Sequence, residues 1–243
     1  MMAGPARTPH VSVFVRGRDD SAAPLMARPT ARRPSRRRII ATVVQDKDLV
    51  VQRHDEIFRA ASRIFISRGY HAASVREIAR EAKLSLGGLY AYVRTKEDIL
   101  YLVFDKITTT LSAEMRRGIQ GIDDPVERIR AALRANLQTT EAYKAEILLM
   151  YQETKSLGRD SRRAVLSREA EYVAFFEEIL RDGYARGVFK GDPRLAADAI
   201  AYLCSIIALR RWSLGSRLSP DAVREGLVAF ILRGLGLPAE DDR

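Results

Sequence analysis

Two tyrosines and a lysine lie close together between residues 90 and 96, where their side chains could hold phosphate groups. Tyr90 and Tyr92 fall on a segment that predicts a very short helix, too short to bury two large polar rings, so their hydroxyls suit phosphate oxygens. Lys96 is the first residue of the next predicted helix, where a positive charge is unfavourable because it opposes the helix dipole. A phosphate that faces the lysine would explain its presence there. The alternative for each of them is an ordinary exposed residue.

Further groups of this kind stand at the starts of two short predicted helices. Ser74 can cap a helix and offer its hydroxyl and the helix N-terminus to a phosphate, and Arg76 follows it in the first turn. Ser85 can cap the next helix in the same way. We therefore expect Ser74, Arg76 and Ser85 to join the tyrosines and Lys96 on one anion-binding face.

The residues after Ser85 are unusual for a helix that reads base edges. Gly87 and Gly88 each weaken a helix by about 1 kcal/mol. One interpretation is that they let the backbone approach DNA closely, with Leu86 against a thymine methyl. The other is a helix that specifies bases poorly and is held by phosphate contacts. The sequence leaves the base preference open.

These groups depend on short helices for their placement. The first predicted helix starts near residue 48, buries one apolar stripe and stops at Gly69. A capping box at 74–77 begins the second, a tight connection at 82–84 leads to the third, and Thr95 caps a fourth that runs from 96 to about 117. Two short helices joined by a three-residue turn predict a helix-turn-helix, whose third helix enters the major groove.

The rest of the chain also predicts helices only. Caps followed by proline at 124–125, 192–193 and 219–220 predict helices near 125–140, 193–213 and 220–233, with two more near 142–156 and 161–186. No stretch alternates with the period of a strand. The fold class is therefore all-α.

Net charge points to an anionic partner and is concentrated at one end. The 243-residue chain carries +10, and residues 1–45, with nine arginines and two aspartates, account for +7. The composition of residues 1–47 is typical of a disordered tail. Such a tail could be an arm that binds phosphates or a minor groove. It could equally be a solvated extension, or sequence upstream of a start at Met26.

Several function classes are disfavoured by the composition. One cysteine and three scattered histidines predict no metal site, and no apolar stretch approaches the length of a membrane span. Cys204 lies among apolar residues and no Gly-rich phosphate loop is present, so neither a catalytic site nor a cofactor is predicted. We expect a cytoplasmic protein that is not an enzyme.

Short sequence elements recur in a fixed order almost continuously over residues 51–102: Ala60-Ala61, Phe65, Gly69-Tyr70, Ile78-Ala79, Leu89-Tyr90 and Lys96-Glu97. This pattern resembles the N-terminal DNA-binding domain of the tetracycline-repressor (TetR) family. In that family the equivalents of Tyr90, Tyr92 and Lys96 commonly contact DNA. Lys83 departs from the pattern, because the family usually has glycine there and a left-handed lysine costs roughly 1 kcal/mol.

The resemblance implies three segments: a basic tail at 1–47, a three-helix helix-turn-helix DNA-binding domain at 48–102, and a larger helical ligand-binding and dimerisation domain at 103–243. The helix at 193–213 is apolar nearly all round, so we expect it to be buried on both sides. In the family the last two helices form a four-helix dimer interface.

Aromatic residues on the central helices are the candidate ligand contacts: Tyr151, Tyr172 and Phe176. Stripes of this kind are more often core than pocket, but the resemblance favours a small-molecule pocket. The Arg210-Arg211-Trp212 ending, together with Tyr151-Gln152-Glu153, looks like acyl-CoA-responsive members that control fatty-acid or steroid degradation. Arg211 would suit CoA phosphates and Trp212 an adenine ring. Helix-end electrostatics and an interface tryptophan are the competing explanation.

The expected protein is thus a homodimeric repressor that binds a palindromic operator in double-stranded DNA and is released by a small hydrophobic effector, with a fatty acyl-CoA as the first candidate. Two alternatives stay open. One is a TetR-like regulator of an efflux pump that senses an aromatic or cationic compound. The other is a ligand-independent architectural DNA binder driven by the basic tail.

Overall fold

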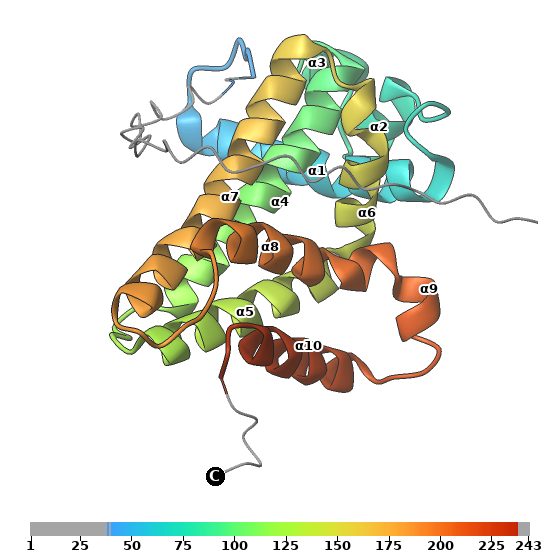
Figure 1. Ribbon diagram of the computed structural model, residues 1–243. Coiled ribbons are helices and arrows are strands. Elements are labelled where there is room, and N and C mark those ends of the chain that lie inside the picture. The colour runs from blue at the N-terminus through green and yellow to red at the C-terminus, as the bar shows by residue number, and fades with distance from the viewer. Residues whose placement is uncertain (1–37, 39, 238–243) are drawn as a thin grey trace, which may run out of the picture. The chain divides into compact units, whose positions relative to one another are not determined.

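The computed structural model describes residue 38 and residues 40–237, in which every regular element is a helix (Figure 1). The all-helical prediction is confirmed. None of the helices in this part of the chain combines the length and the apolar character needed to cross a membrane. In chain order the elements are α1 (Lys47–Arg68), α2 (Val75–Glu81), α3 (Leu86–Tyr90), α4 (Lys96–Gly118), α5 (Pro125–Ala142), α6 (Lys144–Glu153), the 3-10 turn η1 (Thr154–Ser156), α7 (Arg159–Ala185), α8 (Pro193–Leu209), α9 (Arg211–Leu214) and α10 (Pro220–Gly234).

The helix starts follow the caps that the sequence predicts. Ser74 forms a complete capping box with Glu77 at the start of α2, and Thr95 forms one with Asp98 at the start of α4. Asp124, Asp192 and Ser219 each accept hydrogen bonds from first-turn N–H groups, and a proline follows each of them: Pro125, Pro193 and Pro220.

Two helices are shorter than predicted, because single residues leave the helical conformation. The helix predicted at 193–213 ends at Leu209, since Arg210 has φ −117° and ψ 21°, and α9 follows as a separate turn. The helix predicted at 142–156 begins only at Lys144, because Tyr143 adopts almost the same angles. The Tyr143 ring packs against Phe58, with the ring centroids 6.3 Å apart. The Arg210 guanidinium lies over the Trp212 ring.

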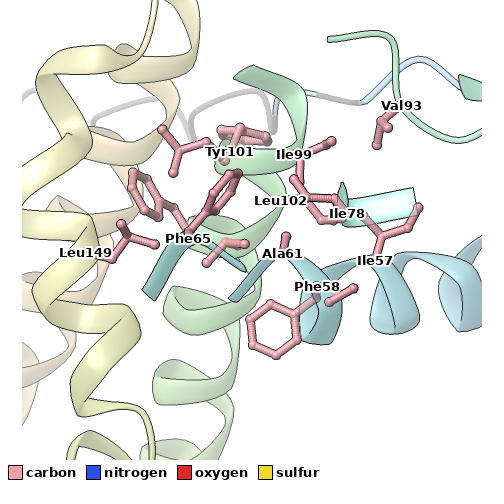
Figure 2. Close-up of a cluster of buried hydrophobic side chains, with 14 of the residues drawn as sticks. Ile57, Phe58, Ala61, Phe65, Ile78, Val93, Ile99, Tyr101, Leu102 and Leu149 are labelled. Atoms are coloured by element: carbon pink, nitrogen blue, oxygen red, sulfur yellow. The ribbon is translucent and has the colours of Figure 1, made fainter. Parts of the chain in front are cut away.

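One apolar core joins the helix-turn-helix to a helix of the C-terminal part. Residues from α1, α2 and α4 pack together with Leu149 of α6, which Figure 2 shows beside Phe65. A second core, which includes Met115 at the far end of α4, is formed with α5, α7, α8 and α10. The predicted domain boundary between residues 102 and 103 therefore falls inside α4, a single helix that runs from one core to the other (Figure 1).

The segment before α1 is folded onto the helix-turn-helix. Arg38 forms an ion pair with Asp98, Ile40 is buried in the first core, and Thr42 donates a hydrogen bond to the carbonyl of Ala91 at 2.8 Å. The prediction of a disordered tail that extends to residue 47 is therefore wrong for Arg38 and for residues 40–46. The remainder of that tail, residues 1–37 and 39, lies outside the described residues.

Candidate nucleic-acid interface and ligand cavity

The turn between α2 and α3 contains a left-handed residue that is not glycine. Lys83 has φ 57° and, within residues 38 and 40–237, no other non-glycine residue has a positive φ. The turn is fixed by hydrogen bonds from the N–H of Ala82 to the carbonyl of Ile78 and from the N–H of Leu84 to that of Ala79. Two short helices are thus held at a sharp angle, as a helix-turn-helix requires.

The exposed residues of these two helices are Arg76, Arg80 and Glu81 on α2 and Gly87 and Tyr90 on α3. Arg76 is exposed, and none of the described residues forms an ion pair with it. Tyr90 is 44% exposed, and a methyl group added at Gly87 would meet no atom within 4 Å. Leu86 is half-buried against the first core, so only part of it remains for a thymine methyl. A nearly flat, open backbone results at Gly87.

Both serines are engaged as helix caps. The Ser74 hydroxyl donates to Glu77 at 2.8 Å and accepts from the Glu77 N–H at 3.2 Å. The Ser85 hydroxyl accepts from the N–H of Gly88 at 2.9 Å. Gly88 cannot be enlarged freely, because an added Cβ would lie 3.1 Å from that hydroxyl. The serines therefore orient the first turns of α2 and α3, and this leaves the other first-turn N–H groups for an anion.

Tyr92 corrects part of the sequence reasoning. The residue lies beyond the end of α3 and is only 8% exposed, so its ring belongs to the first core. The tyrosine is buried because the chain turns back towards α1 after α3, where the Tyr92 carbonyl also lies 3.2 Å from the ring of His54. Interaction with Tyr92 contributes to the raised pKa of Arg53, although less than Glu56 does.

Lys96 has partners within the protein. Its ammonium donates to the carbonyl of His71 at 3.0 Å and lies 4.7 Å from the centre of the Tyr70 ring. Partial burial lowers its pKa, while the charges of Glu153 and Glu77 act in the opposite direction. These contacts explain a lysine at a helix start without a phosphate, so a DNA contact by Lys96 stays a prediction.

A polar junction that no sequence pattern predicted links this region to the C-terminal helices. His71 Nε2 lies 3.4 Å from Glu153 Oε2 at the end of α6, and the Ser156 hydroxyl donates to the same carboxylate at 2.6 Å. Beside Lys96, Glu97 accepts a hydrogen bond from Ser161 of α7. The end of α6 and the start of α7 are thus tied to the start of α4.

A cavity of about 270 Å³ opens among α4, α5, α6, α7 and α8. Its interior is mainly apolar, and no lysine, arginine or histidine lines it. The lining residues are Thr108, Leu111, Thr140, Ile147, Met150, Tyr151, Thr154, Val165, Glu169, Tyr172, Val173, Asp198, Ala201, Tyr202 and Ser205. Its volume is near the lower end of the range for small-molecule sites, about 300 Å³.

The five predicted ligand residues do not form one site. Tyr151 and Tyr172 line the cavity, and the Tyr151 hydroxyl donates to Ser205 at 3.1 Å. Phe176 is fully buried in the second core beside Tyr172, so it supports the wall rather than lining it. Arg211 lines a different hollow of about 220 Å³ with Glu141 and Lys144.

Trp212 is also outside the cavity. It is 71% exposed on α9, and the Arg210 guanidinium lies 4.8 Å from the centre of its ring. Neither residue lines the cavity. The chain breaks at Arg210, so Arg211 and Trp212 lie on α9 outside the cavity. Their contact with the phosphates and adenine of CoA stays a prediction.

Two carboxylates give the cavity a negative rim. Glu169 of α7 and Asp198 of α8 are both partly solvent-exposed. Desolvation raises the pKa of Glu169, and the charge of Asp198 raises it further. Deeper in the protein, burial raises the pKa of Tyr172 well above its ordinary value and that of the Cys204 thiol to about 12, so both stay protonated.

The rim residues could have been found from helical spacing. Asp198, Ala201, Tyr202 and Ser205 recur at i, i+3, i+4 and i+7, which places them on one face of α8. Val165, Glu169, Tyr172 and Val173 recur at i, i+4, i+7 and i+8, which places them on one face of α7. What the sequence does not show is that the two faces meet. Among the described residues, no three acidic, cysteine or histidine side chains could hold a metal ion.

Comparison with known families matches both parts of this fold. Residues 57–101 match the model of bacterial regulatory proteins of the tetR family, and residues 122–235 match the tetracyclin repressor-like C-terminal domain. The first match covers the second half of α1, α2, α3 and the start of α4, and the second covers α5 to α10.

Whole-chain relatives agree with these matches. The HTH-type transcriptional regulator HbdR of Aromatoleum sp. (strain CIB) is 32% identical over 194 residues, which cover 79% of this chain and 85% of HbdR. The HTH-type transcriptional repressor KstR2 of Mycolicibacterium smegmatis is 26% identical and covers 75% and 90% of the two chains. The crystal structure of AibR in complex with isovaleryl coenzyme A and operator DNA is similar, with a TM-score of 0.64, 26% identity and coverage of 73% and 97%. The chain belongs to the TetR family of DNA-binding transcriptional regulators.

Proposed function

We propose that the protein is a dimeric repressor that reads a palindromic operator with α3 and leaves it when an effector enters the cavity. Regulators of this family bind DNA as dimers and respond to small molecules. Two exposed apolar side chains on the last helices support dimer formation here: Leu195 of α8 is 73% exposed and Phe230 of α10 is 59% exposed. A two-fold dimer places its reading helices about 34–36 Å apart, one turn of DNA.

The proposed DNA contacts combine side chains with open backbone. Arg76 and Tyr90 are exposed and would reach phosphates, while Gly87 and Gly88 let the α3 backbone approach the groove. Leu86 would meet a thymine methyl with its exposed part. The N-termini capped by Ser74 and Ser85 would hold further phosphates. Tyr92 is only 8% exposed and has little surface for such a contact, and Lys96 would have to exchange its contact with His71 for a phosphate.

The effector proposed first is an acyl-CoA with a small acyl group. AibR, which is 26% identical, has been crystallised with isovaleryl coenzyme A and operator DNA, and this supports a thioester for the present chain. The cavity of about 270 Å³ is small for a ligand site. A short branched chain or one ring therefore suits it better than a steroid nucleus or a long fatty chain.

One observation carries the regulatory proposal: α6 takes part in the cavity, in the core of the helix-turn-helix and in the polar junction. Met150 and Tyr151 line the cavity, Leu149 packs beside Phe65, and Glu153 contacts His71. An effector that displaces α6 would therefore disturb the placement of α4 and of the reading helices. It acts only through its unequal affinity for the DNA-fitting and non-fitting states.

Release from DNA tests this proposal. The full chain is bound to a duplex from its own upstream region and titrated with isovaleryl-CoA, benzoyl-CoA and free CoA. We expect one of the thioesters to release the DNA at concentrations at which CoA has no effect. No release by either thioester would reject the acyl-CoA proposal.

A regulator that senses an aromatic cation is the second candidate. The negative rim formed by Glu169 and Asp198, together with the lack of basic residues in the lining, favours it specifically. Release by a planar cation such as ethidium, with no effect of the thioesters, would select this candidate. In either case we propose a regulator without catalytic activity, which works in the cytoplasm because its operator lies there.

A further inference from the structure

Glu169 and Asp198 lie at the cavity without a cation to neutralise them. Neither carboxylate forms an ion pair or a hydrogen bond with another of the described residues. On the same helix, Arg168 pairs with Asp105 and Glu171 and so leaves Glu169 uncompensated. The charge of Asp198 raises the pKa of Glu169, so the two carboxylates repel each other when both are ionised.

These carboxylates face the position that the polar end of a bound effector would occupy. The buried lining is mainly apolar, with Leu111, Ile147 and Val165 beside two threonines whose hydroxyls are hydrogen-bonded within their own helices, Thr108 and Thr140. The two carboxylates, Tyr151 and Tyr202 lie at the exposed edge. An effector with one apolar end therefore places its functional group beside Glu169 and Asp198. A third negative charge at this position meets repulsion from both.

We propose that Glu169 and Asp198 determine effector specificity by excluding free carboxylic acids. A neutral thioester or amide, or a group that donates hydrogen bonds, is accepted at the rim, whereas the corresponding carboxylate is rejected. The protein would thus respond to an activated acyl group and not to the acid from which it is made. The inference rests on the proposed role of the cavity as the effector site.

The charge on CoA itself does not contradict this selection. A neutral pantetheine arm separates the acyl group from the phosphates, and exposed charges more than about 8 Å apart are largely screened at physiological salt. The first groups that leave the cavity would be the thioester and the amide N–H groups of that arm. Amide donors suit carboxylate acceptors.

A matched pair of probes tests the inference by direct binding. S-benzoyl-N-acetylcysteamine is a neutral thioester, and benzoate carries the same ring with a free carboxylate. Binding of each to the full-length protein is followed by calorimetry. We expect benzoate to bind the unaltered protein at least about tenfold more weakly, since like charges in contact cost more than the 1.4 kcal/mol that corresponds to tenfold.

The double variant E169Q/D198N distinguishes charge exclusion from a simple lack of contacts. Its affinity for benzoate is expected to rise at least about tenfold, while that for the thioester changes by less than about threefold. Glu178→Gln, which removes an exposed carboxylate of α7 outside the cavity lining, should change neither.

The outcome is independent of DNA release. Equal binding of both probes to the unaltered protein, no gain of benzoate binding in the double variant, or no binding of either probe would overturn the inference. Failure of the thioesters to release DNA, with selective binding intact, would instead reject only the proposed acyl-CoA response.

Discussion

Replacing Asp98 by asparagine should destabilise the start of α4 more than any other change of a single charge at the helix-turn-helix. Asp98 Oδ1 accepts from Arg38 Nη2 at 2.5 Å, and Oδ2 accepts from the N–H groups of Arg94 and Thr95 at 3.1 and 3.0 Å. The Arg38 guanidinium also lies 5.0 Å from the centre of the Tyr101 ring. One carboxylate thus completes a helix cap and holds the segment before α1.

The magnitude follows from the burial of this pair. Removing one partner of a fully buried ion pair costs about 3–5 kcal/mol. The side chains of Asp98 and Arg38 are 8% and 28% exposed, so water can partly solvate the arginine that is left. Asparagine retains an acceptor for the cap. We therefore expect D98N to lower the free energy of unfolding by about 2–3 kcal/mol.

Urea unfolding of the full chain measures this loss, with an unchanged m-value as the sign that only stability is affected. D123N, at an exposed aspartate in the turn before α5, is the control and should change stability by less than about 0.5 kcal/mol. A double-mutant cycle with Arg38→Met then isolates the pair. A loss below about 0.5 kcal/mol for D98N, or no coupling in the cycle, would refute this account of Asp98.

The same pair predicts a pH dependence. Burial alone would raise the pKa of Asp98, but hydrogen bonds from Arg38 and Thr95 outweigh it, so the pKa in the folded state lies below the ordinary value. The stabilisation is therefore complete above the pKa of about 4 of an unfolded aspartate, and it is lost as pH falls through the lower folded value. The stability difference between the protein and D98N should accordingly shrink below about pH 4.

Four further changes test other parts of the structure. Lys83→Gly should raise the free energy of unfolding by about 0.5–1 kcal/mol, because relief of the left-handed strain exceeds the added entropy of the unfolded chain; urea unfolding would show a loss if the turn needs the lysine. Phe230→Asp should yield monomers in sedimentation analysis and weaken operator binding, while a dimer that persists at micromolar concentration would count against α10 as an interface. Ala201→Phe should fill the cavity and weaken effector-induced release at least about tenfold without reducing DNA affinity; an unchanged response would place the effector elsewhere. Glu153→Gln should reduce the effect of the effector on DNA affinity about fivefold, the lower range of typical coupling, and full coupling in this variant would exclude the contact with His71 as a link.

Local chemistry explains why much of the fold could be predicted. The capping boxes at Ser74 and Thr95 and the proline starts of α5, α8 and α10 depend on neighbours within four residues, and all of them form as expected. Lys83 is left-handed at the turn position where the family usually has glycine, although the cost of that conformation favoured a slightly different turn. Local rules did not predict the breaks at Tyr143 and Arg210, because the helical pattern continues through both.

The site was less predictable, because its members come from different helices. Tyr151 and Tyr172, which were selected as aromatic residues at helical spacing, line the cavity, but Phe176 of the same stripe is buried behind it. Arg211 and Trp212 were selected by chemistry alone, and the break at Arg210 turns them away. Asp198 was missed because an acidic residue does not resemble a contact for an anionic effector.

Contacts between distant segments were also hidden in the sequence. Arg38 belongs to a run of arginines whose composition predicts disorder, yet its partner Asp98 stands 60 residues along the chain. The link between His71 and Glu153 likewise joins two ordinary surface residues. Such pairs become visible only when the packing of α1, α4 and α6 is known.

Selection of DNA by the full-length protein tests the central claim most directly. The protein is mixed with a library of random duplexes, and the bound fraction is sequenced after several rounds at physiological salt. The account predicts one palindromic motif whose half-sites are centred about one helical turn, 10–10.5 base pairs, apart, or a multiple of this. Retention of all sequences alike, with binding that depends only on salt, would contradict a reading helix and leave a non-specific DNA binder.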